Sequence, residues 1–250
     1  MNTTAFPSVF VLVFLGVLTG LTLPAAQAAD PVDAVISRAR AALGPERVLN
    51  AVDTLYYRGR IFNEAGEEEG LITLAFKKPY LQRVEVVEDG IESTSVVDDY
   101  EGYFMQTNMA TGDQQIIMMS ADRFRLMADT GLENLYFFRG PLQRRNGQIK
   151  LAGEQEINGV AVDVVEFIYP DGIVFTRYFD RLSGKLLRTH STDGDYTLTE
   201  EGTFTAGGIN FPRRILTEMD GKMVRTIEFF EIIVNKPMTA ADFAFPAAKP

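Results

Sequence analysis

The stretch "VAVDVVEFIYPDGIVFTRYFDRLSGKLLRTH", from Val160 to His190, decides the fold class. It consists of short runs of β-branched and aromatic residues, which are interrupted by Asp171-Gly172 and Ser183-Gly184. Such runs favour strands, and Asp-Gly pairs favour tight turns because their residues tolerate positive φ. The stretch therefore predicts consecutive antiparallel strands that are joined by hairpins.

The same pattern continues on both sides of this stretch. Similar runs upstream are "TLYYRGRIF", "LITLAF", "LQRVEVVE", "ESTSVV" and "YFMQ", and those downstream include "DYTLTEEGTF", "FPRRILTEM" and "KMVRTIEFFEIIV". The last run is apolar on both faces, whereas a sheet with one wet face would alternate more cleanly. The order predicts a mainly β, α+β fold: five or so strands, a helical insert and six or seven further strands in one antiparallel meander. The sheet should curl or be partly covered on both faces.

Two helices are expected before the first strand. Asp30 is a suitable N-cap, Pro31 suits the first turn, and Gly44 ends the helix. A second, weaker helical segment runs from Pro45 to about Val52.

The helical insert, "IIMMSADRFRLMADTGLENLYFF" (Ile116 to Phe138), is rich in methionine and aromatic residues. Ser120 can cap its helix, and Gly131 is expected to interrupt it. Met105, Met109, Met118, Met119 and Met127 are five of the nine methionines. Thioether side chains adapt to irregular apolar shapes, so the insert fits either an ordinary core or a deformable binding surface.

The N-terminal residues predict export. An apolar run from about Val9 to Leu23 precedes Ala26-Gln27-Ala28, which fits a cleavage site. We expect a signal peptide over residues 1–28, a single domain over 29–250 and a location in a bacterial periplasm. The alternative is a retained membrane anchor, because no Lys or Arg precedes the apolar run.

The composition argues against several functions. The net charge of −10 argues against a nucleic-acid partner, because phosphate binding requires a basic surface, and the absence of Cys excludes disulfides. His190 lies beside Ser191 and Asp193, but neighbours in sequence do not supply the geometry of a catalytic triad. Asp98, Asp99 and Glu101 do not match a calcium loop. We expect no enzyme, no cofactor and no metal site.

Three stretches together resemble a known family. They are "YFDRLSGKLLR" (Tyr178 to Arg188), "GTFTAGGINFPRRI" (Gly202 to Ile215) and "NKPMTAADFAFP" (Asn235 to Pro246), and "AALGPERVLNAVDTLYYRGR" (Ala41 to Arg60) adds to them. They resemble motifs of the LolA/LolB-like periplasmic lipoprotein-carrier superfamily. The resemblance implies a strongly curved antiparallel half-barrel, with helices plugging its concave face and an apolar cavity that receives acyl chains.

The resemblance sets the functional expectation. The chain should hold a lipid or lipoprotein acyl chain non-covalently, with a transient envelope protein as a possible partner. The alternative is an envelope scaffold or sensor that binds a protein through its sheet. The residues expected at the cavity or its lid are Met105, Met119, Phe124, Met127, Leu132, Leu135, Tyr136, Phe138, Ile227 and Phe229. Those expected at the mouth, near a head group, are Arg58, Arg60 and Arg139, the last of which begins a basic cluster with Arg144, Arg145 and Lys150.

Overall fold

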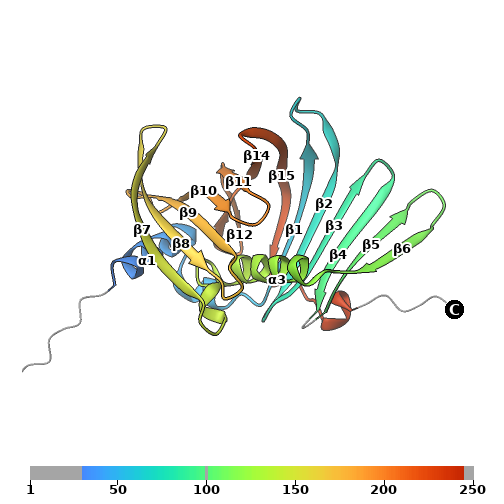
Figure 1. Cartoon of the computed structure of the whole chain (residues 1–250), viewed down its shortest axis with the longest axis horizontal. Helices are drawn as coiled ribbons and strands as arrows, with labels where there is room; N and C mark the ends of the chain where they lie inside the picture. The colour runs from blue at the N-terminus through green and yellow to red at the C-terminus, as the bar shows by residue number, and fades with distance from the viewer. Residues whose placement is uncertain (1–29, 99–100, 245–250) are drawn as a thin grey trace, which may run out of the picture.

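The computed structural model describes residues 30–98 and 101–244 (Figure 1). The predicted signal peptide, its cleavage site and Asp99 lie outside these residues. Within the described ranges, no helix is both long enough and apolar enough to cross a membrane.

Fifteen strands are described, and thirteen of them form one antiparallel sheet in the order β6-β5-β4-β3-β2-β1-β15-β14-β11-β10-β9-β8-β7. The remaining pair, β12 and β13, forms a separate hairpin. The bounds are β1 Thr54–Phe62, β2 Glu68–Lys77, β3 Leu81–Glu88, β4 Ile91–Asp98, β5 Glu101–Asn108, β6 Gln114–Met118, β7 Gln148–Ile157, β8 Val160–Ile168, β9 Val174–Asp180, β10 Leu186–Ser191, β11 Tyr196–Glu201, β12 Phe204–Ala206, β13 Ile209–Phe211, β14 Arg214–Met219 and β15 Lys222–Val234.

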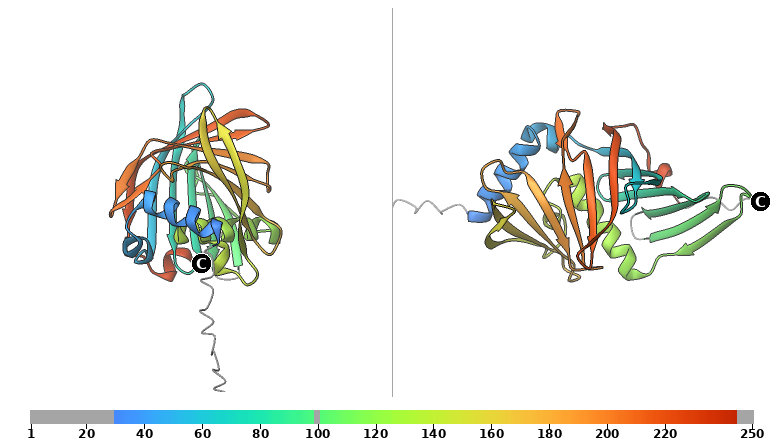
Figure 2. Two further views of the ribbon diagram at one scale, coloured as in Figure 1. Left: turned by 90° about the vertical axis from the view of Figure 1, so that its left-hand side faces the viewer. Right: turned by 90° about the horizontal axis from the view of Figure 1, so that it is seen from above.

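The sheet is curved but not closed. Its two edges, β6 and β7, do not pair with each other in the described structure. Viewed from its end, the sheet arches over the helices, which lie on its concave side (Figure 2). The prediction of a mainly β, antiparallel half-barrel with helices on the concave face is therefore confirmed.

The three α-helices begin where the sequence predicts. The helix α1 (Pro31–Leu43) is capped by Asp30, whose carboxylate accepts a hydrogen bond from the Val32 amide at 3.1 Å. The short helix α2 (Glu46–Asn50) follows directly. The helix α3 (Ala121–Tyr136) is capped by the Ser120 hydroxyl, which accepts from the Arg123 amide. Two short 3₁₀ helices, η1 (Pro141–Gln143) and η2 (Ala240–Phe243), complete the fold.

The helix α3 holds a central place because it connects the two edges of the sheet. It leaves β6 and, through η1, leads to β7 at the opposite edge, so it crosses the concave face (Figure 1). Its buried residues contribute to two core clusters. Leu132 packs with α1 residues and with Phe167 and Phe179 of β8 and β9, while Leu135 packs with Leu55 and Phe229 of β1 and β15.

Two details of the insert differ from the prediction. Residues 116–118 belong to strand β6, which pairs with β5, rather than to the helix. The helix α3 is also continuous through Gly131, which does not interrupt it. Gly131 instead permits close approach to β3, because an added Cβ would lie 3.0 Å from the Gln82 Oε1 atom. A glycine inside a helix can thus mark tight packing rather than a break.

A β-bulge explains why the last strand is apolar on both faces. The register of β1 with β15 shifts between Arg58, opposite Glu231, and Gly59, opposite Phe229. The extra residue is Phe230, and a bulge places two residues opposite one. Phe229 and Ile232 consequently pack in the same core cluster, although simple alternation assigns them to opposite faces.

Candidate functional site

A cavity lies on the concave side of the sheet, beside the C-terminal part of α3. Its volume is about 140 Å³. One side of the cavity is formed by Phe138 and Leu186, which pack in the core cluster around Leu132. The other side is formed by Tyr57 and Phe229, which belong to the cluster around Leu135. The cavity therefore occupies the seam between the two clusters. The full lining is Leu43, Tyr57, Leu74, Glu133, Asn134, Phe137, Phe138, Arg177, Leu186, Glu200, Asn210, Phe211, Pro212, Ile215 and Phe229.

A second space of about 380 Å³ adjoins the first. The two share six lining residues: Leu43, Leu186, Glu200, Asn210, Phe211 and Pro212. The second space reaches the end of α1 and the turn between β9 and β10, where Gly184 and Lys185 lie. Together the two spaces extend from the middle of the concave face to the turns beside α1.

The hairpin of β12 and β13 supplies one wall of both spaces. It folds back over the concave face, where Ile209 and Phe211 are buried against Leu49 and Tyr57. The end of α1 passes close to its turn, because an added Cβ at Gly44 would lie 2.7 Å from the Gly208 carbonyl oxygen. Gly44 thus ends the helix, as predicted, and also lets the hairpin pack against it.

The apolar walls contain a buried polar cluster. Arg177, on β9, forms an ion pair with Glu133 on α3, and the Tyr169 hydroxyl donates to the other oxygen of Glu133. The guanidinium also lies over the Phe167 ring, at 4.6 Å from its centroid, and over the Phe138 ring, at 5.3 Å. Arg177 and Glu133 therefore balance each other's charge inside the core.

Glu200 is a further carboxylate at the junction of the two spaces. It is half-buried on β11, opposite Ile215 of β14. Burial raises the pKa of Glu200 to about 7, although the positive charge of Arg177 acts in the opposite direction. The cavity is apolar overall, but its junction carries a carboxyl group that can be charged or uncharged near neutral pH.

The C-terminal end of α3 is attached to α1 through Arg40. This side chain is 2% exposed, and its Nη1 atom donates to the carbonyl oxygens of Tyr136 at 2.9 Å and Phe137 at 2.6 Å. The same guanidinium donates to Glu46 and Asn50. The hydrogen bond from Arg40 is the largest effect that lowers the pKa of Glu46. Arg40 therefore satisfies carbonyl groups that a helix end leaves without intrahelical partners.

Of the ten residues expected at the cavity or its lid, Phe138 and Phe229 line the cavity. Leu132, Leu135, Tyr136 and Ile227 belong to or contact the two clusters around it. Met119, Phe124 and Met127 lie together over Val97, nearer the N-terminal end of α3. Met105 lies elsewhere, in a cluster with Phe243 of η2.

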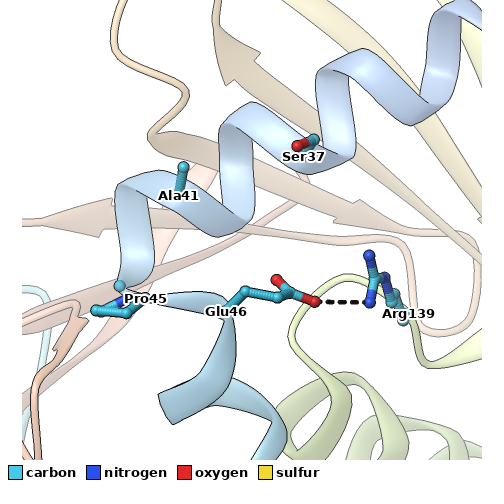
Figure 3. A pocket seen from close by; sticks show the side chains of 6 residues that line it. Ser37, Ala41, Pro45, Glu46 and Arg139 are labelled. Carbon is cyan, nitrogen blue, oxygen red and sulfur yellow. Dashed lines mark hydrogen bonds and ion pairs between the residues drawn. The ribbon is translucent and has the colours of Figure 1, made fainter.

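The three arginines expected at the mouth do not line the cavity. Arg58 and Arg60 lie over the ring of Phe230, at 5.2 and 5.5 Å from its centroid. Arg139 lines a different pocket, between α1, the start of α2 and the segment that follows α3, where it donates to Glu46 at 2.8 Å (Figure 3). Arg144, from the same basic cluster, pairs with the buried Asp129 at 3.3 Å.

Glu133, Arg177 and Glu200 line the cavity but were not predicted from the sequence. For two of them, the strand pattern of the sequence indicates an inward-facing position. Arg177 lies between Phe175 and Phe179 at a spacing of two, and Glu200 follows Leu198 in the same way. A charged residue in the apolar phase of a strand is a candidate for an interior polar site.

The positions of the described residues do not support a hydrolase triad at His190 or a metal site. His190 and Ser191 are adjacent on β10, so they point to opposite faces, and the Ser191 hydroxyl donates to the Asp193 carbonyl oxygen. His190 Nε2 lies 3.7 Å from Asp195. Within residues 30–98 and 101–244, no group of three or more His, Cys, Asp or Glu is arranged to hold a metal ion.

Comparison with known proteins identifies the fold. No family model matches this sequence, and no curated protein matches it. Several solved structures are similar, and among them are the following three. A DUF1329 family protein from Desulfovibrio piger has a TM-score of 0.55 and 14% identity, over 86% of this chain and 98% of that one.

The second is a putative outer membrane lipoprotein-sorting protein domain from Vibrio parahaemolyticus, with a TM-score of 0.53 and 14% identity over 84% of this chain and 94% of that one. The third is a LolA superfamily protein from Nitrosomonas europaea, with a TM-score of 0.56 and 13% identity over 85% and 97%. The expected resemblance is confirmed at the level of the fold. The chain is therefore a divergent protein with the LolA-like fold.

Proposed function

We propose that this protein holds an acyl chain of a lipid or lipoprotein non-covalently, in the periplasm, and that it catalyses no reaction. The observation that carries the proposal is the apolar cavity between α3 and the concave face of the sheet. The lipoprotein-sorting domain among the similar structures supports the same class of ligand. The apolar run before residue 29 supports export.

The size of the site indicates how it would accept a chain. Ligand pockets typically measure about 300–1,000 Å³. The inner cavity of about 140 Å³ is too small alone, whereas the adjoining space of about 380 Å³ brings the site into that range. An acyl chain would therefore occupy both spaces. Transfer from a bilayer is close to neutral, because the chain is already out of water there.

The first test is a variant that fills the inner cavity. Leu74 is half-buried in its lining, so Leu74→Phe should reduce lipid binding severalfold while the melting temperature changes little. The matched control is Leu151→Phe, at an exposed site on β7. Binding is measured by native mass spectrometry of protein purified from its own periplasm, and by titration with a fluorescent fatty acid. Unchanged binding by Leu74→Phe, or no lipid mass on the wild type, would contradict the proposal.

The second test concerns α3. If an acyl chain enters by displacing the N-terminal end of α3, Phe124→Ala and Met127→Ala should weaken lipid binding more than they lower the melting temperature, because these side chains make the apolar contacts of that end with Val97. Proportionate losses of binding and stability would instead identify them as ordinary core residues.

A second candidate function, a scaffold or sensor that binds a protein, is favoured by one observation. The edge strand β6 is exposed at every position, and Ile116, Ile117 and Met118 carry no charge. The opposite edge, β7, has Lys150, Glu154 and a bulge, which are devices that discourage strand addition. An extended segment of a partner protein can pair with such an unprotected edge.

The two candidates make different predictions about β6. A photo-crosslinker at Gln115 would capture the partner's strand, and Ile117→Lys would abolish the adduct, if the scaffold reading holds. A carrier that does not use this edge would retain its lipid in the Ile117→Lys variant and give no specific adduct.

A further inference from the structure

The charges that face the cavity do not cancel. Three ionisable side chains contribute to its lining in addition to Tyr57: Glu133, Arg177 and Glu200. Glu133 pairs with Arg177 and accepts from Tyr169, and Arg177 is also stacked on two aromatic rings. The remaining carboxylate is Glu200, so the lining of the inner cavity carries one negative charge whenever Glu200 is ionised, while Lys185 lines only the outer space.

The surroundings of Glu200 leave its oxygens available to a ligand. Within the described residues, it forms no hydrogen bond or ion pair, although Arg177 exerts a long-range attraction. Strand pairing places it beside the apolar Ile215, and both cavity spaces contact it. Because Glu200 is half-buried and its side chain has no protein partner, a charged donor that reaches it from the cavity can form a charge-assisted hydrogen bond without displacing another residue.

We propose that Glu200 binds the polar end of the ligand, and that this end is a cationic hydrogen-bond donor, a protonated amine, attached to an apolar chain. This inference rests on the proposed function and names its ligand class. A hydrogen bond between an ammonium and a carboxylate is roughly twice as strong as one between neutral groups. An anionic head group would instead meet a like charge while Arg177 is already paired with Glu133.

The geometry suits an amphiphile of this kind. The apolar chain would lie in the inner cavity against Tyr57, Leu74 and Phe229, and the amine would lie at the junction with the outer space, where Glu200 and Asn210 are found. The side chain of Asn210 donates to the Ala42 carbonyl oxygen and lies close to Thr205, so it frames the junction without adding charge.

The experiment compares three ligands that differ only in the head group: dodecylamine, dodecanol and dodecanoate, each below its critical micelle concentration. Binding to the wild-type protein is measured at pH 8 by displacement of a fluorescent apolar probe. The amine should bind at least about tenfold more tightly than the carboxylate, the factor that corresponds to 1.4 kcal/mol.

Two variants assign the preference to this residue. Glu200→Gln should lower the affinity for dodecylamine by about tenfold and leave that for dodecanol within about threefold, because it removes the charge but keeps the shape. Glu201→Gln is the matched control, since its neighbouring carboxylate is exposed and pairs with Arg214 at 3.4 Å. A melting curve of each variant establishes that it is folded. The comparison of the three ligands on the wild-type protein remains a test even if a variant does not fold.

The pH dependence gives an independent readout. Protonation of Glu200 as the pH falls from 8 to 5 should weaken amine binding in the wild type and have little effect in Glu200→Gln. The other charged or titratable groups that face this region are Arg177 on β9, Glu133 on α3, Tyr57 on β1 and Lys185 in the turn before β10. They are present in both proteins, so the difference between the two pH profiles isolates Glu200.

The outcomes separate the two proposals. If the wild type binds none of the three ligands, the carrier function itself fails. If it binds all three without preference, or prefers the carboxylate, or if Glu200→Gln behaves as the wild type, the amine inference fails while the carrier function stands.

Discussion

The two ends of α3 are held very differently. At the C-terminal end, Leu132 and Leu135 are buried, Glu133 pairs with Arg177, and Arg40 bonds the last carbonyl groups. At the N-terminal end, residues 121–123 are exposed, and the contacts come from half-buried Phe124 and Met119 together with the buried Met127.

The difference teaches where this helix can move. Displacing the C-terminal end would break ion pairs and leave buried carbonyl groups without partners, whereas displacing the N-terminal end would mainly expose flexible apolar side chains. The helix is thus expected to open from its N-terminal end, with the cavity beside the firmly held end keeping its shape. The following predictions test this comparison.

The largest effect is expected from Arg40→Ala. This variant leaves two buried carbonyl oxygens, those of Tyr136 and Phe137, without their donor. Because each unsatisfied buried group costs about 1–3 kcal/mol, the free energy of unfolding should fall by about 3–5 kcal/mol. Urea denaturation measures it. The control is Arg47→Ala, at an exposed site on α2, which should change stability by less than about 0.5 kcal/mol. A loss below about 1 kcal/mol for Arg40→Ala would show that this end is not firmly held.

A pair of truncations compares the two ends directly. Leu135→Ala should cost about 2–5 kcal/mol because the side chain is fully buried. Phe124→Ala should cost less than half as much, since Phe124 is only half-buried. Denaturant titration of both variants gives the ratio. Equal losses would contradict the asymmetry of α3.

An intermediate effect is expected on the pH dependence of stability, through Asp129 on α3. Burial, and secondarily the charge of Asp171, raises the pKa of Asp129 to about 7. The folded protein therefore binds this proton more tightly than the unfolded chain, so the contribution of Asp129 to stability is greatest at low pH and is lost as the pH rises from about 4 towards 7. In the Asp129→Asn variant, the decrease in the free energy of unfolding between about pH 4 and pH 7 should be smaller by about 1–3 kcal/mol.

The control for this effect lies at the exposed end of the helix. Asp122 is exposed and pairs with Arg125 one turn later, so Asp122→Asn should leave the pH profile of the melting temperature unchanged. Glu200 contributes with the same sign as Asp129, because burial also raises its pKa to about 7. The double variant Asp129→Asn with Glu200→Gln should flatten the profile further. A profile that Asp129→Asn leaves unaltered would exclude Asp129 as its source.

The smallest effect is expected at Gly131, between the two ends. Alanine favours a helix by about 1 kcal/mol over glycine, but its Cβ would crowd the Gln82 side chain, which is 4% exposed. The two effects nearly cancel, so Gly131→Ala should change stability by less than about 1 kcal/mol. A clear stabilisation in a thermal melt would mean that α3 is not closely packed on β3 at this point.

The sequence predicted much of this molecule because many of its signals are local. Asp30 and Ser120 cap helices through hydrogen bonds to amides two or three residues away, and Asp89-Gly90 and Asn158-Gly159 form turns at positive φ. Such features depend on neighbouring residues alone. The candidate site was predicted only in part: Phe138 and Phe229 were expected there, whereas the pairing of Glu133 with Arg177 forms only when α3 crosses the sheet.

By itself, then, the sequence determined the strands, turns and helix caps, and its motifs indicated the LolA-like fold. Tertiary structure decided the rest. It made residues 116–118 an edge strand, because β5 offers them a pairing partner, and it kept α3 continuous at Gly131, because the helix packs closely there. Two further features depend on segments that are far apart in the chain. One is the β-bulge at Phe230, and the other is the cavity lining in which Arg177 lies with Glu133 and Glu200. Only long-range packing free energy selects such contacts, and no local pattern encodes it.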